Sequence, residues 1–345
     1  MAPPGPDLPT PIGVSPQFDA MMTAVSRVAP LSRPVLLVGE RGTGKELVAS
    51  RLHYLSPRWN RPFIKLNCGG LSDSLLETEL FGHEAGAFTG AQRRRIGRFE
   101  LAHKGTLFLD EIANAPATVQ ETILRVVEYG TFERVGGNET VEVDVRLVAA
   151  TNEDLPSLAA QGRFRADLLD RLAFDVITLP PLRERPEDIE PLARHVATAM
   201  ARELGRDTVP GFSTGALAAL HAHSWPGNVR ELKNVVERAV YRAPPDGDVS
   251  EIIIDPFASP WRPRPKGSEV TTDNGGPPRL TGPIDFTQRI AAEEKALLTE
   301  ALAINHHHQK QTAAFLGLSY HQLRNQLTKH GLIGANRPSA PQSSP

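Results

Sequence analysis

The chain has 345 residues, of which 40% are hydrophobic and 23% charged, and its formal net charge is −2. This length allows two or three domains, and a charge near zero excludes nucleic-acid binding through overall charge, so such binding would need a local basic region. The lone cysteine, Cys68, excludes an internal disulfide framework and fits a reducing cytoplasm, where we expect the protein to act.

Residues 1–11 are rich in proline and are predicted to be disordered. The segment has neither a basic start nor an apolar core, so it does not resemble a signal peptide. No apolar run in the chain approaches the roughly 20 residues that a membrane span requires, and we therefore expect no membrane insertion.

The first predicted strand, 34–38, enters a glycine-rich loop that opens a helix over 45–55. This context is typical of a phosphate-binding loop, whose backbone N–H groups surround phosphates at a helix N-terminus. Lys45 would reach the β- and γ-phosphates of ATP, whereas Glu46 stands where the motif usually has a hydroxyl ligand for Mg²⁺. The alternative is a glycine-rich turn without function. The predicted ATP-binding residues here are Gly39, Glu40, Arg41, Gly42, Thr43, Gly44, Lys45 and Glu46.

Two further buried strands are predicted over 63–68 and 105–109, and the second ends in Asp110 and Glu111. An apolar strand that ends in two carboxylates is the Walker B pattern. Asp110 would hold Mg²⁺ directly or through water, and Glu111 would polarise the attacking water. The alternative is a strand that ends in a solvated acidic turn. Cys68, near a strand end, is interpreted as a small apolar residue and not as a nucleophile.

A helix over 117–128 and a strand over 145–150 follow, and the strand ends in Thr151 and Asn152. Polar residues at the carboxyl end of a strand lie where ligands bind in open α/β sheets, so this pair could sense the γ-phosphate. The pair could instead cap the next helix. Strands that alternate with helices predict an α/β fold with a parallel sheet covered on both faces.

The pattern becomes wholly helical from about residue 185, which predicts a helical lid subdomain. We expect an α/β subdomain over 12–185 and a lid over 186–258. Residues 259–284 are dense in proline and glycine without an apolar period, and they are predicted to form a flexible linker.

Residues 285–334 are predicted to form an all-α helix-turn-helix domain, followed by a disordered tail over 335–345. A helix over about 287–304 precedes a helix from Gln311 to Leu316, a turn at Gly317 and a helix from Ser319 to Lys329. Ala313 and Ala314 are small where two helices approach. Tyr320, Leu323 and Leu327 fall at helical spacing and should pack inward. The first helix could dimerise the domain.

Acidic residues are absent after Glu300, so a polyanion is the natural partner of this end of the chain. Arginine, asparagine and glutamine on a second helix suit base edges in the major groove of double-stranded DNA. A plain helical hairpin is the alternative. His306, His307 and His308 face different directions on a helix and are not predicted to bind a metal. The predicted DNA-binding residues are Lys310, Gln311, Ser319, His321, Gln322, Arg324, Asn325 and Lys329.

Several strings together resemble the sigma-54-dependent transcription activators, also called bacterial enhancer-binding proteins. These are GERGTGKE, ELFGHEAGAFTGA, GTLFLDE, FRADLLDRL and WPGNVRELKN, in this order. The resemblance implies an AAA+ ATPase that assembles as a ring, usually a hexamer, and remodels sigma-54 RNA polymerase holoenzyme. It also implies a Fis-type domain that binds an upstream DNA sequence. Glu46 is normal in this family, so it does not weaken the prediction of ATP binding.

The resemblance also assigns roles to individual residues. Arg165 and Arg171 look like arginines that reach a neighbouring subunit's γ-phosphate, and Arg230 looks like a second sensor on the lid; a surface ion pair is the alternative for each. Asn67 resembles the residue that holds the catalytic glutamate idle. The mobile loop that contacts sigma-54 would be Gly86, Ala87, Phe88, Thr89, Gly90 and Ala91.

Trp59 lies in a predicted loop over 56–62. The match is closer still to the phage shock activators of this family, in which this region resembles the docking site of a negative regulator. Packing of Trp59 into the core is the alternative. No receiver domain precedes the ATPase motifs, which favours control by a separate regulator.

Two other functions share part of the pattern. An AAA+ unfoldase or clamp-type remodeller would have the ATPase motifs but needs neither the GAFTGA loop nor a terminal helix-turn-helix. A DNA-binding repressor with a vestigial ATPase would tolerate the loss of Lys45, Glu111 or the arginines, and all of these are present.

Overall fold

A computed structural model describes residues 10–245, 247–257, 259, 261–262, 285–305 and 308–332. The chain divides into two compact units, Met1–Pro260 and Trp261–Pro345. The predicted disordered residues 1–9 and 335–345, most of the predicted linker, and His306 and His307 lie outside the described residues.

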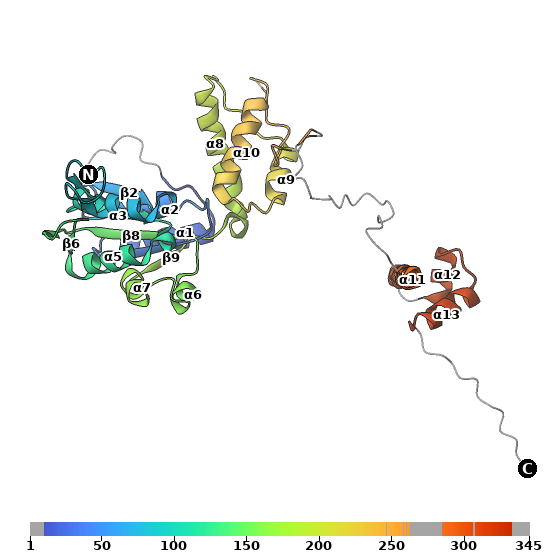
Figure 1. Ribbon diagram of the computed structural model, residues 1–345. Coiled ribbons are helices and arrows are strands. Elements are labelled where there is room, and N and C mark those ends of the chain that lie inside the picture. The colour runs from blue at the N-terminus through green and yellow to red at the C-terminus, as the bar shows by residue number, and fades with distance from the viewer. Residues whose placement is uncertain are drawn as a thin grey trace, which may run out of the picture. The chain divides into compact units, whose positions relative to one another are not determined.

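A five-stranded parallel sheet forms the centre of the first unit, in the order β2-β5-β8-β1-β9. Figure 1 shows this sheet with its covering helices. The strands are β1 (Val35–Val38), β2 (Phe63–Asn67), β5 (Thr106–Asp110), β8 (Arg146–Thr151) and β9 (Val176–Thr178). The predicted parallel α/β sheet is confirmed. The sequence interpretation missed β9, which is three residues long and exposed at both ends.

Alternating side chains of the strands build one hydrophobic core on each face of the sheet, as expected for strands buried on both sides. Leu36, Leu107 and Leu109 face α3 (Asp73–Phe81), α4 (Arg98–Leu101), α5 (Ala117–Tyr129), α6 (Leu155–Ala160) and α7 (Ala166–Leu172). Leu37 and Phe108 face α1 (Pro16–Val28) and α2 (Lys45–Tyr54). Both cores end at the carboxyl edge of the strands, where the polar motifs lie.

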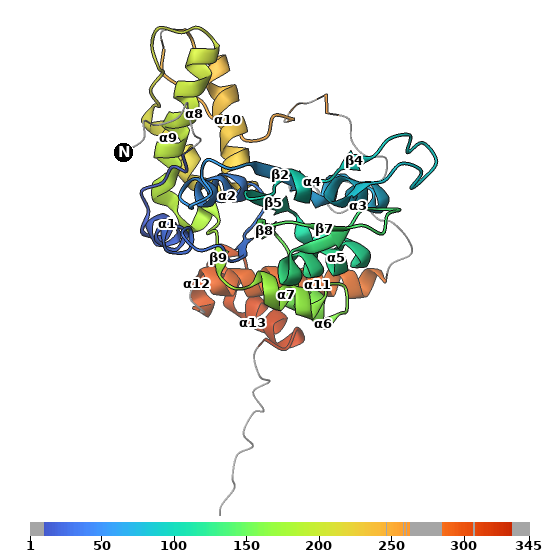
Figure 2. The same cartoon turned by 90° about the vertical axis from the view of Figure 1, so that its left-hand side faces the viewer.

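Two small antiparallel hairpins extend from this sheet domain. One pairs β3 (Gly82–His83) with β4 (Arg95–Ile96), and the other pairs β6 (Thr131–Glu133) with β7 (Thr140–Glu142). In Figure 2 the segment next to β4 projects from the sheet domain as a long loop. The loops of the two hairpins meet, because Glu84 N donates to Val135 O at 3.1 Å.

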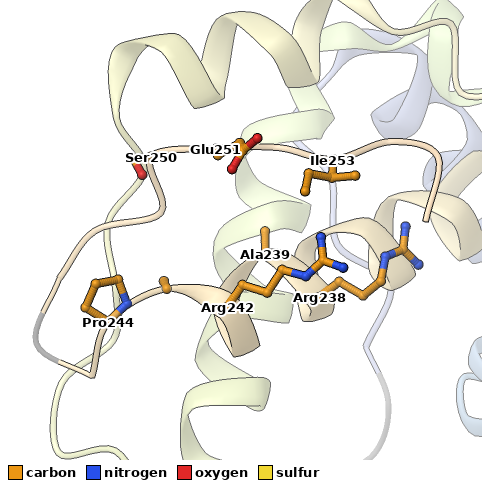
Figure 3. Close-up of a pocket in the computed structure, with 8 residues that line it drawn as sticks. Arg238, Ala239, Arg242, Pro244, Ser250, Glu251 and Ile253 are labelled. Carbon is orange, nitrogen blue, oxygen red and sulfur yellow. The ribbon is translucent and has the colours of Figure 1, made fainter. Parts of the chain in front are cut away.

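A helical subdomain follows the sheet and comprises α8 (Ile189–Glu203), α9 (Thr214–Ala222) and α10 (Asn228–Arg242). Its core is built around Trp225, which is fully buried and whose indole N–H donates to Leu220 O. The segment after α10 folds back over that helix, and Arg238 donates to Ile254 O at 3.2 Å. Figure 3 shows Arg238 and Arg242 of α10 beside Glu251 and Ile253 of this segment, around a small hollow of about 90 Å³.

The second unit contains α11 (Phe286–Ile304), α12 (Gln309–Phe315) and α13 (Tyr320–Lys329). Leu323 and Leu327 are fully buried together with Leu298, Leu302 and Ala313. The prediction that Tyr320 packs inward is wrong: it is 37% exposed because it occupies the first position of α13, beyond the core. Ala314 is exposed as well, so of the two alanines only Ala313 packs into the core, beside the fully buried Thr312.

Candidate functional site

The glycine-rich loop 39–46 lies between the end of β1 and the start of α2. Gly42 and Gly44 have φ angles of +80° and +101°, where a side chain would introduce strain. No other group lies within 4 Å of the position that a Gly44 side chain would take, so the loop faces open space at the N-terminus of α2. A helix N-terminus with such a loop attracts anions.

Lys45, the first residue of α2, is 8% exposed. Its Nζ donates to the carbonyls of Gly39 at 2.8 Å and Glu40 at 3.0 Å. Burial lowers the pKa of Lys45, as do the nearby charges of Arg230 and Arg41, against the opposing influence of Asp110 and Glu111. The ammonium group is thus held over the loop by two neutral carbonyl acceptors.

Asp110 and Glu111 stand at the end of β5, beside Asn67 at the end of β2. Asp110 accepts a hydrogen bond from Glu111 N at 2.9 Å, and burial raises the pKa of its carboxyl. Glu111 has a φ of +52°. This left-handed turn carries its carboxylate to Arg41 at 3.4 Å and to the amide of Asn114 at 3.4 Å.

Gly69 and Asn114 belong to this site, although the motif analysis missed both. A side chain at Gly69 would lie 2.1 Å from Glu111 Oε2, so this glycine leaves room for the carboxylate. Asn67 Oδ1 accepts from Gly69 N at 2.7 Å and caps the turn Cys68–Gly70. Cys68 is 2% exposed, and burial raises the pKa of its thiol to about 12, in agreement with its interpretation as a small apolar residue.

Thr151 ends β8 next to the start of the glycine-rich loop, and its carbonyl accepts from Gly39 N at 3.1 Å. Its hydroxyl accepts from Glu153 N at 2.9 Å, while Asn152 is exposed. The alternative that this pair caps the following helix is wrong, because the N-cap of α6 is Asp154.

Carboxylates near the loop fit Mg²⁺, which proteins bind through one or two carboxylates together with substrate phosphates. Asp110 is half-buried, and the charge of Glu46 acts on it. Glu46 is otherwise paired with Lys65 at 2.9 Å. Within the described ranges there is no cluster of three or more side chains that could hold a metal by themselves, so phosphate oxygens would have to complete the coordination.

The lid subdomain touches the loop directly. Arg230 N donates to Gly42 O at 3.3 Å, and Arg230 lines a hollow together with Arg41. A second, mainly apolar groove of about 560 Å³ lies between α2, the N-terminal segment and the lid. Its apolar walls include Ile12, Leu47, Leu192 and Val229. The sequence interpretation missed this groove, because its walls come from separate parts of the chain.

Arg165 and Arg171 lie at α7, and both make surface ion pairs. Arg165 donates to both oxygens of Asp167 at 3.1 and 2.7 Å, and Arg171 donates to Glu128 at 2.7 Å. Both arginines are exposed. Neither ion pair includes a residue of the glycine-rich loop of the same chain, so their predicted role depends on a second subunit.

The loop between β3 and β4 carries the GAFTGA string. Gly86 and Gly90 have φ angles of +82° and +104°, and Gly86 N donates to Ala91 O at 2.7 Å to close the loop. Phe88 is 48% exposed at this loop. At the base, the buried Arg134 donates to Glu100 at 3.0 and 2.7 Å and to Glu84 at 3.0 Å, which fixes the start of the loop to its neighbours.

Trp59 is 53% exposed, so the alternative that it packs into the core is wrong. Its loop is nevertheless held firmly. Arg58 donates to Gly105 O at 3.1 Å and to the Asp144 side chain at 2.6 Å. The buried His53 contacts Thr106 Oγ1 at 3.0 Å below the loop. Trp59 is therefore a large apolar side chain presented on a braced turn.

In the second unit, His321, Arg324 and Asn325 are exposed on α13, and Lys310 and Gln311 are exposed on α12. Ser319 and Gln322 form the capping box of α13, so part of their hydrogen-bonding capacity serves the helix. Lys329 pairs with Glu294 of α11 at 2.9 Å. Arg324 and Asn325 therefore present their polar groups on the exposed side of α13.

Three family descriptions match successive parts of the chain. "Sigma-54 interaction domain" matches residues 12–178, "AAA+ ATPase lid domain" residues 183–255, and "Bacterial regulatory protein, Fis family" residues 289–330. None of the helices built from described residues has the length and apolar character of a membrane span.

Similar proteins agree with these matches. The Psp operon transcriptional activator of Escherichia coli K12 is 54% identical over 320 residues, which cover 92% of this chain and 97% of that protein. The Nif-specific regulatory protein of Azotobacter vinelandii is 49% identical over 70% of this chain and 46% of its own length. The crystal structure of NtrX from Brucella abortus with ATP has a TM-score of 0.65 and 32% identity, and the match covers 93% of this chain and 69% of NtrX.

Proposed function

Because the chain belongs to the sigma-54-dependent transcription activators, an AAA+ family, we propose that it hydrolyses ATP to remodel sigma-54 RNA polymerase holoenzyme into an open complex. The observation that carries this proposal is the coexistence of two features in one sheet domain. Lys45, Asp110 and Glu111 meet at the carboxyl edge of the sheet, and an extended loop exposes Phe88.

The phosphates of ATP would bind the backbone N–H groups of residues 39–46 and Lys45. Asp110, with Glu46 nearby, would hold Mg²⁺, which neutralises phosphate charge when bound. Glu111 would accept a proton from, or orient, the attacking water. The groove beside Leu47 and Val229 suits the adenine ring, since pockets for such ligands combine mainly apolar walls with a few polar groups, here including His195 and Lys233.

Other residues of this site would respond to the nucleotide. Thr151 and Asn152 stand beside the loop and could sense the γ-phosphate. Asn67, next to Asp110 in the sheet, could hold Glu111 idle if its amide Nδ2 donated to the carboxylate, while its Oδ1 accepts from Gly69 N. Arg230 would reach the phosphates from the lid.

A ring of subunits, usually six in this family, would complete the catalytic site. The exposed Arg165 and Arg171 would leave their surface carboxylates and approach the γ-phosphate bound by a neighbour. Each guanidinium would exchange its carboxylate partner for the phosphate. Its positive charge would then stabilise the negative charge that develops on the phosphate in the transition state, which accounts for the large rate effects of such arginines.

The loop from Gly86 to Ala91 would contact sigma-54. Phe88 supplies an exposed apolar tip and Thr89 a small polar one, while the glycines permit the loop to change conformation. The Fis-type unit would bind double-stranded DNA upstream of the promoter, with α13 in the major groove. Both activities place the protein in the cytoplasm.

The genes controlled would be those of the phage shock response to membrane stress, by similarity to the Psp operon transcriptional activator. Trp59 would be the docking point for a negative regulator that acts in trans. An exposed tryptophan on a loop braced by Arg58 supports this role, because a rigid aromatic anchor loses little entropy on binding.

Open-complex formation tests the proposal. Purified full-length protein is mixed with sigma-54 RNA polymerase, a matching promoter and ATP, and ATP hydrolysis is followed in parallel. We expect the wild type to open the promoter. Thr89→Ala should hydrolyse ATP at a rate within about twofold of wild type but open no promoter. Gln92→Ala, just outside the loop motif, is the matched control and should behave like wild type.

A wild-type protein that hydrolyses ATP without affecting any sigma-54 promoter would favour the AAA+ remodeller of another target. A protein that binds the promoter DNA and lowers transcription without hydrolysing ATP would instead favour the DNA-binding repressor with a vestigial ATPase.

A further inference from the structure

Glu40, the second residue of the glycine-rich loop, is bound by Arg183, in the segment that leads into the lid subdomain, and by Asn228 of α10 in the lid itself. Arg183 donates to Glu40 through both Nη atoms, at 2.6 and 2.9 Å. Asn228 Nδ2 donates to Glu40 Oε2 at 3.0 Å. These bonds join residues 143 and 188 positions apart in the chain. They hold the pKa of Glu40 at about 2, so its carboxylate stays charged at neutral pH.

Asn228 is fully buried at the start of α10, and its amide is fully used. Its Oδ1 accepts from Leu182 N at 2.8 Å, and its Nδ2 donates to Arg41 O at 3.1 Å in addition to Glu40. The residue has a φ of +52°, which asparagine tolerates better than most side chains. A buried amide with every hydrogen bond satisfied fixes a specific geometry between the loop and the lid.

The main chain of Glu40 binds Lys45, the lysine that is proposed to bind phosphate. The carbonyl of Glu40 accepts from Lys45 Nζ at 3.0 Å and from Thr43 Oγ1 at 2.9 Å. Glu40 therefore makes two kinds of contact. Its backbone carbonyl contacts Lys45, and its carboxylate contacts the lid.

The backbones of the loop and the lid also meet closely at this point. A side chain on Gly42 would lie 2.3 Å from Gly227 O, so only glycine permits the approach. Val229 and Arg230 follow directly in α10 and line the groove and the hollow beside the loop. A shift of the loop at Glu40 would consequently move the two lid residues that line this groove and this hollow.

We propose that Glu40 is a positioning residue that ties the lid to the phosphate-binding loop through Arg183 and Asn228, so that occupation of the phosphate site sets the position of the lid. The inference rests on the proposed ATP binding. Phosphate would draw Lys45 Nζ away from the Glu40 carbonyl, and the loop would pass this change to the lid through the carboxylate.

The expected size of the effect follows from the exposure of the ion pair. Arg183 and Glu40 are 44% and 42% exposed, so their charge attraction alone contributes little to stability. Loss of the bonds between Glu40 and the lid should instead leave the lid correctly placed in only a fraction of the molecules. The apparent affinity for ATP is then the intrinsic affinity multiplied by that fraction.

The test compares Glu40→Gln, Arg183→Gln and the double variant of the full chain. The dissociation constants for ATP and ADP are measured by calorimetry, and KM and kcat by ATP hydrolysis. We expect each single variant to raise KM and both dissociation constants about tenfold, with kcat at saturation within about twofold. The double variant should be no worse than either single variant, because both remove one coupled interaction.

Glu190→Gln is the matched control, since it removes an ion pair with Arg194 that lies within α8 and does not reach the loop. It should leave KM unchanged.

A normal KM for Glu40→Gln, or additive effects in the double variant, would overturn the proposed coupling between Glu40 and the lid. The proposed ATP hydrolysis by the wild type would be unaffected by such a result. A wild type that neither binds nor hydrolyses ATP would overturn the proposed function itself. Thermal unfolding separates either result from loss of fold, and the exposed Arg183 provides a variant that should fold normally.

Discussion

Phe88 lies edge-on to the imidazole of His83, with ring centroids 5.0 Å apart and ring planes at 66°. Both residues belong to the same hairpin, so the apolar tip of the loop rests on the first strand of its own base. A half-exposed aromatic contact of this kind is worth about 0.5 kcal/mol, which is small enough for a partner to replace. The loop can therefore exchange an internal contact for an external one.

Phe88→Ala should abolish binding of sigma-54 in the presence of an ATP transition-state analogue, because it removes the apolar tip. Its ATP hydrolysis should remain within about twofold of wild type. His83→Ala removes only the resting contact and should retain binding. Both are checked by co-elution with purified sigma-54, and normal co-elution of Phe88→Ala would contradict the assigned contact.

Arg171→Ala should lower the rate of ATP hydrolysis about 10³-fold if the guanidinium acts on a neighbour's phosphate. Lys45→Ala should also be inactive, because it lacks the phosphate-binding lysine. Mixing the two inactive variants should restore part of the activity, since some interfaces then pair an intact loop with an intact arginine. Glu121→Gln, which breaks the surface pair with Arg125 on α5, serves as the control. If mixing restores nothing, the arginine acts within its own subunit or only in folding.

Arg324→Ala should weaken binding to the specific DNA site by about 1–3 kcal/mol, the usual contribution of an arginine that contacts a guanine. Binding to random DNA should change much less. Lys310→Ala is expected to weaken both kinds of DNA about equally and to reduce the salt dependence by about one phosphate contact. The comparison requires titrations of both DNAs at several salt concentrations. Equal losses for Arg324→Ala on both DNAs would argue against base recognition.

Cys68 should not react with thiol reagents in the native protein at pH 8. Its side chain is 2% exposed, and burial raises the pKa of the thiol to about 12, so almost no reactive thiolate forms. In guanidinium chloride one thiol per chain should react rapidly, since the sequence contains a single cysteine. Fast stoichiometric labelling without denaturant would show that the turn Cys68–Gly70 opens readily.

Local patterns in the sequence were sufficient to predict the glycine-rich loop, the strand that ends in Asp110 and Glu111, and the helix-turn-helix. Each depends on residues close together in the chain: glycines before a helix, an apolar run before carboxylates, or Leu323 and Leu327 on one face of a helix. The family resemblance rested on the same kind of short strings.

Other features were decided by tertiary structure. Helical spacing placed Tyr320 in the core, but its position at the start of α13 leaves it exposed. Trp59 is held outside because Arg58 reaches Asp144, 86 positions away in the chain. The bonds between Glu40 and the lid, and the apolar groove beside Leu47, join segments separated by up to 188 positions. The partner of a polar side chain depends on which elements pack together, and no local pattern along the chain encodes that choice.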